Sequence, residues 1–127
     1  MYDSNNVFAK IIRGEIPCKK ICENDHALSF YDINPLFEKH ALIIPKGDFV
    51  NILDFVTRAT PTAQQEFWNC FRQTAEKLGI NENFNIMANA GADAPFVEQS
   101  VFHFHLHLMS GGRVAEFDRE MDRICHK

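Results

Sequence analysis

The chain has 127 residues, the size of one domain with a buried core, and 46% of them are hydrophobic, among them twelve phenylalanines. The formal net charge is −4 and no Lys/Arg stripe is present, so a groove that binds nucleic acid is not expected. The sequence also lacks a signal-peptide layout, a long apolar run and a Cys-x-x-Cys pair, which together predict a cytoplasmic protein with free thiols and no membrane span.

The first half of the chain predicts one short helix followed by three strands. Between Ser4 and Gly14, apolar residues recur at helical spacing and a glycine follows them, which is the pattern of a short amphipathic helix. Strands are predicted at residues 19–23 and 27–33, joined as a hairpin by a short polar turn. Residues 40–45 read as a nearly continuous apolar strand, which indicates a central place in a sheet.

The second half predicts one long helix and two further strands. Residues 48–55 carry apolar side chains without a clear period, so they are expected to be irregular or a short helical turn. Thr60 and the proline after it are typical of a helix start, and the helical pattern of residues 61–78 ends at Gly79. A strand is predicted at residues 83–89, and a loop then leads to the last strand.

That last strand carries the most informative pattern in the chain. Residues 101–109 read VFHFHLHLM, so His103, His105 and His107 are expected on one face and apolar residues on the other. A turn at Gly111-Gly112 is expected to end the strand. Three imidazoles in a row on one face fit a chemical site better than three unrelated structural histidines.

A metal site is one alternative for the three histidines, because neutral imidazole is a common zinc ligand. On a strand, however, His103 and His107 would be separated by ~13 Å at the backbone. All three rings could then reach one ion only if the strand bent, although two neighbouring rings could share a metal with a third ligand. A reacting His105, with a donor ring on each side of an anionic group, requires no such bend.

The element order of helix, three strands, long helix and two strands predicts an α+β domain with an antiparallel sheet of about five strands, one short helix and one long helix. No repeat or internal boundary is visible, so residues 1–127 are predicted to form a single domain. Its core is expected at about residues 5–112. The charged tail at residues 113–127 lacks a strong helix pattern.

The motif HFHLHLM at residues 103–109 resembles the signature of the histidine-triad (HIT) family, His-φ-His-φ-His-φ-φ with φ apolar. Upstream, NNVFAKIIRGEIP, FYDINP and KHALIIPK resemble the first helix, the ribose-binding strand end and the central strand of the Hint branch, the nucleoside phosphoramidate hydrolases. The resemblance implies a homodimer with a continuous sheet, in which a purine nucleoside phosphoramidate or related conjugate is cleaved through a covalent nucleotidyl-histidine.

The same resemblance implies a role for each matching residue. His105 would attack the α-phosphorus, with its Nδ1–H held by the backbone carbonyl of His103. His103 and His107 would flank the phosphoryl group, and His40 would complete the proton network. The other implied nucleotide-binding residues are Asp32 at the ribose hydroxyls, Ser100 and Asn89 facing the phosphate, Val7, Phe8, Ile11, Ile33 and Leu42 around the base, and Gln99 in the matching segment before the triad.

The chain also departs from the pattern of the family that it resembles. The cysteine pair that binds structural zinc in some members of that family is replaced by NNVFAK, so no metal and no other cofactor is expected. Residues 96–98 read FVE where the Hint branch is usually glycine-rich, and the tail contains no tryptophan. Both differences concern the leaving group, whose identity does not carry over. A metal-dependent hydrolase and a nucleotide-binding adaptor with little turnover stay open as alternatives.

Overall fold

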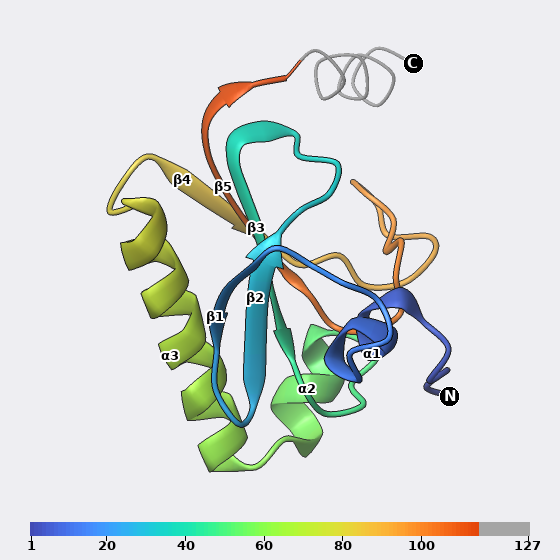
Figure 1. Ribbon diagram of the computed structural model, residues 1–127. Helices are drawn as coiled ribbons and strands as arrows, with labels where there is room; N and C mark the ends of the chain where they lie inside the picture. The colour runs from blue at the N-terminus through green and yellow to red at the C-terminus, as the bar shows by residue number, and fades with distance from the viewer. Residues whose placement is uncertain (115–127) are drawn as a thin grey trace.

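The computed structural model describes residues 1–114, which form one five-stranded antiparallel sheet with helices on both faces (Figure 1). The strands lie in the order β1-β2-β3-β5-β4, and each neighbouring pair is antiparallel. The predicted α+β class and five-stranded sheet are confirmed. The element bounds are α1 Val7–Ile12, β1 Lys20–Glu23, β2 Ala27–Tyr31, β3 Phe37–Pro45, α2 Ile52–Arg58, α3 Pro61–Leu78, β4 Phe84–Met87 and β5 Leu106–Arg113.

The ends of α1 and α3 follow from their capping residues, as the sequence predicts. The Asn6 side chain accepts a hydrogen bond from the Ala9 N–H at the start of α1, and the Thr60 hydroxyl accepts one from the Ala63 N–H at the start of α3. Past the last turns, Gly14 has φ +79° and Gly79 has φ +70°, the left-handed conformation that glycine adopts without a steric cost.

Helix α2 is the element that the sequence left undecided, and it raises the helix count in residues 1–114 to three instead of two. The Asn51 side chain caps it by accepting from the Asp54 N–H, and Arg58 pairs with the Asp54 carboxylate. Of its apolar side chains, Phe55 is buried while Leu53 and Val56 are exposed. These exposed apolar residues mask the helical period in the sequence.

The strands of the sheet divide their side chains between two faces. Helix α3 contacts β1, β2 and β3 on one face, whereas α1 lies on the other (Figure 1). Ala27 and Ile43 belong to the core under α3, while Leu28, Phe30 and Leu42, at alternate strand positions, pack with Phe8 of α1. Full burial of one phenylalanine side chain stabilises the fold by ~1.5–3 kcal/mol.

Strand β5 differs from the predicted histidine strand at both ends. It begins at Leu106, so His103 and His105 precede it, and it continues through the glycine pair instead of turning there. The register pairs Phe37 with Arg113 and Lys39 with Ser110, so Gly111-Gly112 together lie opposite Glu38, which is a β-bulge. A Cβ atom on Gly111 would lie 2.9 Å from the Glu38 side chain, and φ is +89° there. The bulge therefore needs glycine.

None of the helices within residues 1–114 is both long and apolar enough to cross a lipid bilayer. Apart from its first two residues, the predicted tail at 113–127 lies outside the described residues.

Candidate active site

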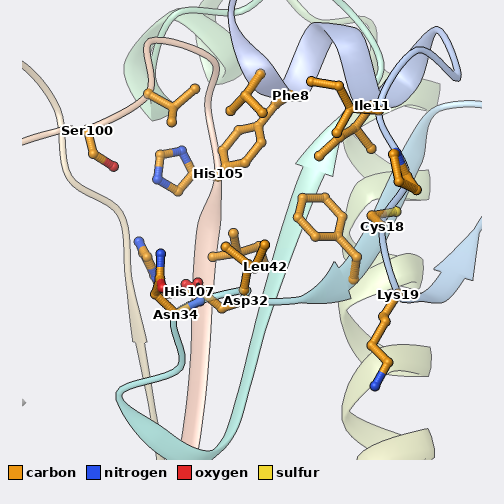
Figure 2. Close-up of a pocket in the computed structure, with 16 residues that line it drawn as sticks. Phe8, Ile11, Cys18, Lys19, Asp32, Asn34, Leu42, Ser100, His105 and His107 are labelled. Atoms are coloured by element: carbon orange, nitrogen blue, oxygen red, sulfur yellow. Dashed lines mark hydrogen bonds between the residues drawn. The ribbon is translucent and has the colours of Figure 1, made fainter. Parts of the chain in front are cut away.

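A pocket of about 580 Å³ opens beside α1, between the end of β2 and the segment that precedes β5 (Figure 2). It brings together residues that are far apart in the sequence, most of them predicted as site residues. The predicted residues that line it are Val7, Phe8, Ile11, Asp32, Ile33, Leu42, Ser100, His105 and His107.

His105 is held in one tautomer at the wall of this pocket. Its Nδ1 lies 2.9 Å from the backbone oxygen of His103, and a carbonyl can only accept, so Nδ1–H is the donor and Nε2 keeps its lone pair. The ring is 4% exposed and packs against Phe8 with the centroids 4.9 Å apart. Burial lowers the pKa of His105, which keeps the ring neutral near pH 7. This form of imidazole is a nucleophile.

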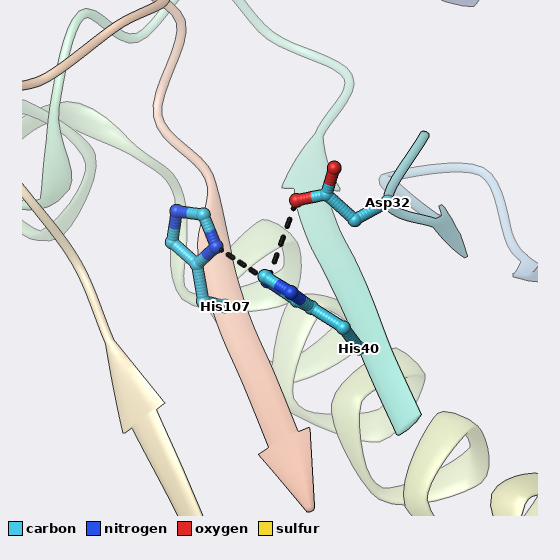
Figure 3. A group of neighbouring side chains, drawn as sticks. All are labelled: Asp32, His40 and His107. Carbon is cyan, nitrogen blue, oxygen red and sulfur yellow. Dashed lines mark hydrogen bonds and ion pairs between the residues drawn. The ribbon is translucent and has the colours of Figure 1, made fainter. Parts of the chain in front are cut away.

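His40 fixes the tautomer of His107 in a similar way (Figure 3). The Leu36 N–H donates to His40 Nδ1 at 3.0 Å, so the ring proton of neutral His40 is on Nε2. That Nε2–H donates to His107 Nδ1 at 2.9 Å, which leaves the His107 proton on Nε2. Burial lowers the pKa of both rings, that of His107 to about 3. His107 is therefore a neutral donor.

The Nε2 atoms of both His105 and His107 face the pocket. No hydrogen bond in the described part of the chain reaches either atom, whereas every buried side-chain nitrogen and oxygen there has a partner. The two atoms therefore reach the open space of the pocket, one as an acceptor and the other as a donor. The ring centroids of the two histidines are 5.1 Å apart. A phosphoryl group in the pocket could contact both.

Asp32 lies at the end of β2 and its carboxylate has two partners. Oδ1 accepts the Asn34 N–H at 2.8 Å, and Oδ2 is 3.3 Å from His40 Nε2. The side chain is thereby fixed between the pocket and the two histidines (Figure 3). A carboxylate can only accept, so its remaining lone pairs suit two hydroxyl groups of a ligand.

The structure corrects the place expected for His103. The ring is fully buried and does not line the pocket, because the chain is not a strand at this position. Its Nε2–H donates to the Pro45 carbonyl at 2.7 Å, and its Nδ1 accepts from the Tyr2 hydroxyl at 2.6 Å. Burial lowers its pKa to about 4. His103 contributes its backbone carbonyl to His105, and its ring does not reach the pocket.

Three other predicted residues do not line the pocket: His40, Gln99 and Asn89. The Gln99 amide accepts from the Gly91 N–H at 2.9 Å and donates to the carbonyls of Val50 and Val101, so it holds the loop before β5. Asn89 is half-buried and is also absent from the lining. Ser100, the residue after Gln99, does reach the pocket beside His105 (Figure 2).

Several lining residues were not predicted. Phe30 could have been predicted, because it lies in β2 two positions before Asp32, and residues two apart on an extended chain point to the same side. The others have no comparable signal, since loop positions and long-range contacts set their places. These are Ile16, Pro17, Cys18, Lys19, Asn34 and Val101 in the lining, and Tyr2 behind His103.

One group of side chains could hold a metal ion. Donor atoms of Asp32, His40 and His107 lie within 4.8 Å of one another. The closest two, His40 Nε2 and His107 Nδ1, are 2.9 Å apart and share a proton. A metal would have to replace that proton, so the present arrangement fits a hydrogen-bonded pair of neutral rings better.

The fold and the site define a small α+β protein with a pocket that is lined by two histidines. Residues 13–114 match the HIT domain, and the chain belongs to this family. It is 46% identical over 114 residues to an uncharacterized 13.2 kDa HIT-like protein of Azospirillum brasilense, with 89% of this chain and 91% of that protein covered. It is 34% identical over 108 residues to the protein hit of Bacillus subtilis, covering 83% and 70%.

Solved structures give the same result. A Hit-like protein is 44% identical, with a TM-score of 0.73 and coverage of 84% of this chain and 99% of that one. A HIT family hydrolase from Clostridium thermocellum is 34% identical, with a TM-score of 0.72 and coverage of 87% and 93%.

Proposed function

We propose that this protein cleaves purine nucleoside 5′-phosphoramidates or related nucleotide conjugates at the α-phosphorus and releases the nucleoside monophosphate. The observation that carries the proposal is His105, a neutral ring whose Nδ1–H is held and whose Nε2 faces the pocket. Membership of the HIT family, in which a similar solved chain is described as a hydrolase, supports this class of reaction. The Hint-like choice of substrate rests on the sequence motifs.

The proposed reaction has two displacements at phosphorus. His105 Nε2 forms a bond to the α-phosphorus while the bond to the leaving group breaks, and the leaving group takes up a proton from solvent as it departs. Water then attacks the phosphorus, the bond to His105 breaks, and the ring returns to its neutral form as the water proton is released. His107 Nε2–H and the Ser100 hydroxyl supply donors for the phosphoryl oxygens, on which charge develops.

The pocket suits a nucleoside in size and polarity. Its volume of about 580 Å³ is within the range of small-molecule sites. The base would lie among the apolar side chains of α1 and Leu42, and the ribose hydroxyls would bind Asp32. Ile33 lines the pocket although it is 91% exposed, so a bound base could cover it.

The decisive experiment tests for the covalent intermediate. The protein is mixed briefly with a phosphoramidate labelled at the α-phosphate and quenched in alkali, where phosphohistidine survives better. Label is expected on the peptide that contains His105, and a panel of phosphoramidates, dinucleoside polyphosphates and nucleotidyl sulfates then ranks the leaving groups. Turnover without label on any histidine contradicts the mechanism. Nucleotide binding without product from any conjugate favours the adaptor.

A metal-dependent hydrolase is the second candidate, and the cluster of Asp32, His40 and His107 is the observation in its favour. The proposed mechanism needs no Lewis acid, so EDTA is expected to leave turnover unchanged. Stoichiometric metal in the purified protein, with activity lost on chelation and restored by zinc, would favour the metalloenzyme instead.

The proposal includes a cytoplasmic homodimer. Strand β4 is at the edge of the sheet, and its Phe84 and Ile86 are 41% and 48% exposed, so a second copy could add its own edge and cover them. Free thiols at Cys18, Cys22 and Cys70 support a reducing compartment. Light scattering is expected to give twice the chain mass, and Ile86→Lys to give the monomer. A wild-type monomer contradicts this part.

A further inference from the structure

The Asp32 carboxylate faces the pocket and also touches a pair of histidines. Its Oδ2 lies 3.3 Å from His40 Nε2, and the same nitrogen lies 2.9 Å from His107 Nδ1. The three side chains thus form a chain that runs from the ribose end of the pocket to the ring beside His105 (Figure 3).

The proton on His40 Nε2 therefore has two acceptors. When it points to His107 Nδ1, the ring proton of neutral His107 is on Nε2, where it can serve a phosphoryl oxygen. An anionic oxygen beside His40 Nε2 favours a proton at that nitrogen over the other tautomer. The Leu36 N–H at His40 Nδ1 acts in the same direction. Two independent contacts, with Asp32 and with the Leu36 N–H, therefore favour the same tautomer of His40.

We propose that Asp32 is a positioning residue for catalysis as well as a ribose contact: through His40 it holds His107 as a hydrogen-bond donor toward the phosphate. The inference rests on the proposed function. It links recognition of the sugar to the chemistry, because the carboxylate that accepts the ribose hydroxyls also orients the donor of the transition state. A substrate without these hydroxyls loses only one of the two effects of Asp32.

Asp32→Asn separates the two roles, because the amide oxygen can still accept the Asn34 N–H while the negative charge is lost. The variant is assayed with a nucleoside phosphoramidate and with its 2′,3′-dideoxy counterpart. For the dideoxy substrate, KM is expected to match wild type, while kcat still falls about ten- to a hundredfold, the range seen when the group that orients a metal-bound histidine is lost. Asp25→Asn, an exposed aspartate outside the pocket, removes the same charge as a control.

Equal kcat of wild type and Asp32→Asn on the dideoxy substrate would show that Asp32 is a ribose contact alone and would overturn the proposal. A double variant with His40→Asn gives a second check. Because Asp32 acts through His40, adding Asp32→Asn to His40→Asn is expected to cost no further kcat on that substrate. Additive losses of kcat would show that Asp32 does not act through His40.

A readout without turnover keeps this inference apart from the proposed function. Nitrogen NMR of the imidazole rings is expected to show His40 and His107 of the wild type protonated on Nε2, and the Asp32→Asn variant to populate the other tautomer. Unchanged spectra in the variant would overturn the inference. If wild type cleaves no conjugate, the proposed function fails, while the NMR result alone still decides the role of Asp32.

Discussion

The two faces of the sheet are built from alternate residues of the same strands, yet they have opposite properties. Under α3, the rings of Phe55, Phe67 and Phe104 pack with centroids 5.0–5.2 Å apart, and the Ser29 and Thr74 hydroxyls bond each other at 2.5 Å. On the other face, a pocket opens beside α1, and within residues 1–114 the Nε2 atoms of His105 and His107 have no hydrogen-bond partner. The face under α3 is packed throughout, whereas the face under α1 combines a smaller packed cluster with a pocket that can take a ligand.

Substitutions on the two faces should therefore affect different properties of the protein. A change under α3 should reduce the free energy of unfolding, while a change of a polar side chain at the pocket should reduce turnover or ligand binding with less effect on stability.

The largest expected effect is that of His105→Asn. Asparagine keeps a polar side chain of similar reach but removes the attacking nitrogen, so turnover should fall by several orders of magnitude while binding of a nucleoside monophosphate changes far less. Steady-state kinetics and calorimetry measure the two quantities. His26→Asn, outside the pocket, is the matched control. Normal turnover by His105→Asn would remove the basis of the proposed mechanism.

The opposite face is tested by Phe67→Ala. Phe67 is fully buried against both Phe55 and Phe104, so the cavity left by alanine should reduce the free energy of unfolding by ~3–5 kcal/mol. Urea titration measures this loss, and turnover of the folded fraction should be unchanged. A turnover defect as large as that of His105→Asn would mean that the two faces are not separable.

The long helix, the sheet and the capping residues could be predicted because their signals are local in sequence. The course of the chain at His103 could not be predicted. Residues 101–109 alternate as in a strand, but the strand begins only at Leu106. The Phe104 N–H donates instead to the Phe49 carbonyl at 2.7 Å, a contact between distant segments. Such contacts carry no signal in the spacing of residues.

The same limit applies to the candidate site. Asp32, His40 and His107 were named from their motifs, and the structure brings them into contact. The tautomers of His40, His105 and His107 depend on backbone groups that a sequence does not reveal, and so does the second use of the Asp32 carboxylate.

The neutral rings also predict a pH dependence of stability. The pKa of His103 falls from an ordinary 6.5 to about 4 and that of His107 to about 3, so the unfolded chain binds these protons first. The free energy of unfolding should be unaffected by these rings above about pH 6.5 and fall between pH 6.5 and 4 by ~1.4 kcal/mol per pH unit for each ring. Urea titrations across this range measure the slope. His103→Asn should lower the slope, and an unchanged slope would contradict the assignment.

Asp32→Ala tests the ribose contact through binding. Loss of hydrogen bonds to a charged group should weaken binding of a nucleoside monophosphate by ~1.5–3 kcal/mol, while a 2′,3′-dideoxy ligand should bind wild type and variant nearly equally. Calorimetry with both ligands measures the difference. An equal loss for both ligands would mean that Asp32 does not bind the ribose hydroxyls.

The smallest expected effect concerns Tyr2, which lies behind the pocket face. Its hydroxyl donates to His103 Nδ1 at 2.6 Å, and burial raises the pKa of the phenol, so it stays protonated. Tyr2→Phe keeps the ring contact but leaves a buried nitrogen of His103 without a donor, which should cost ~1–3 kcal/mol of unfolding free energy. Because the His103 carbonyl orients His105, turnover should also fall severalfold, with KM unchanged. Tyr31→Phe, an exposed tyrosine, is the control. Equal stability and turnover of the two variants would show that the contact between Tyr2 and His103 does not support the site.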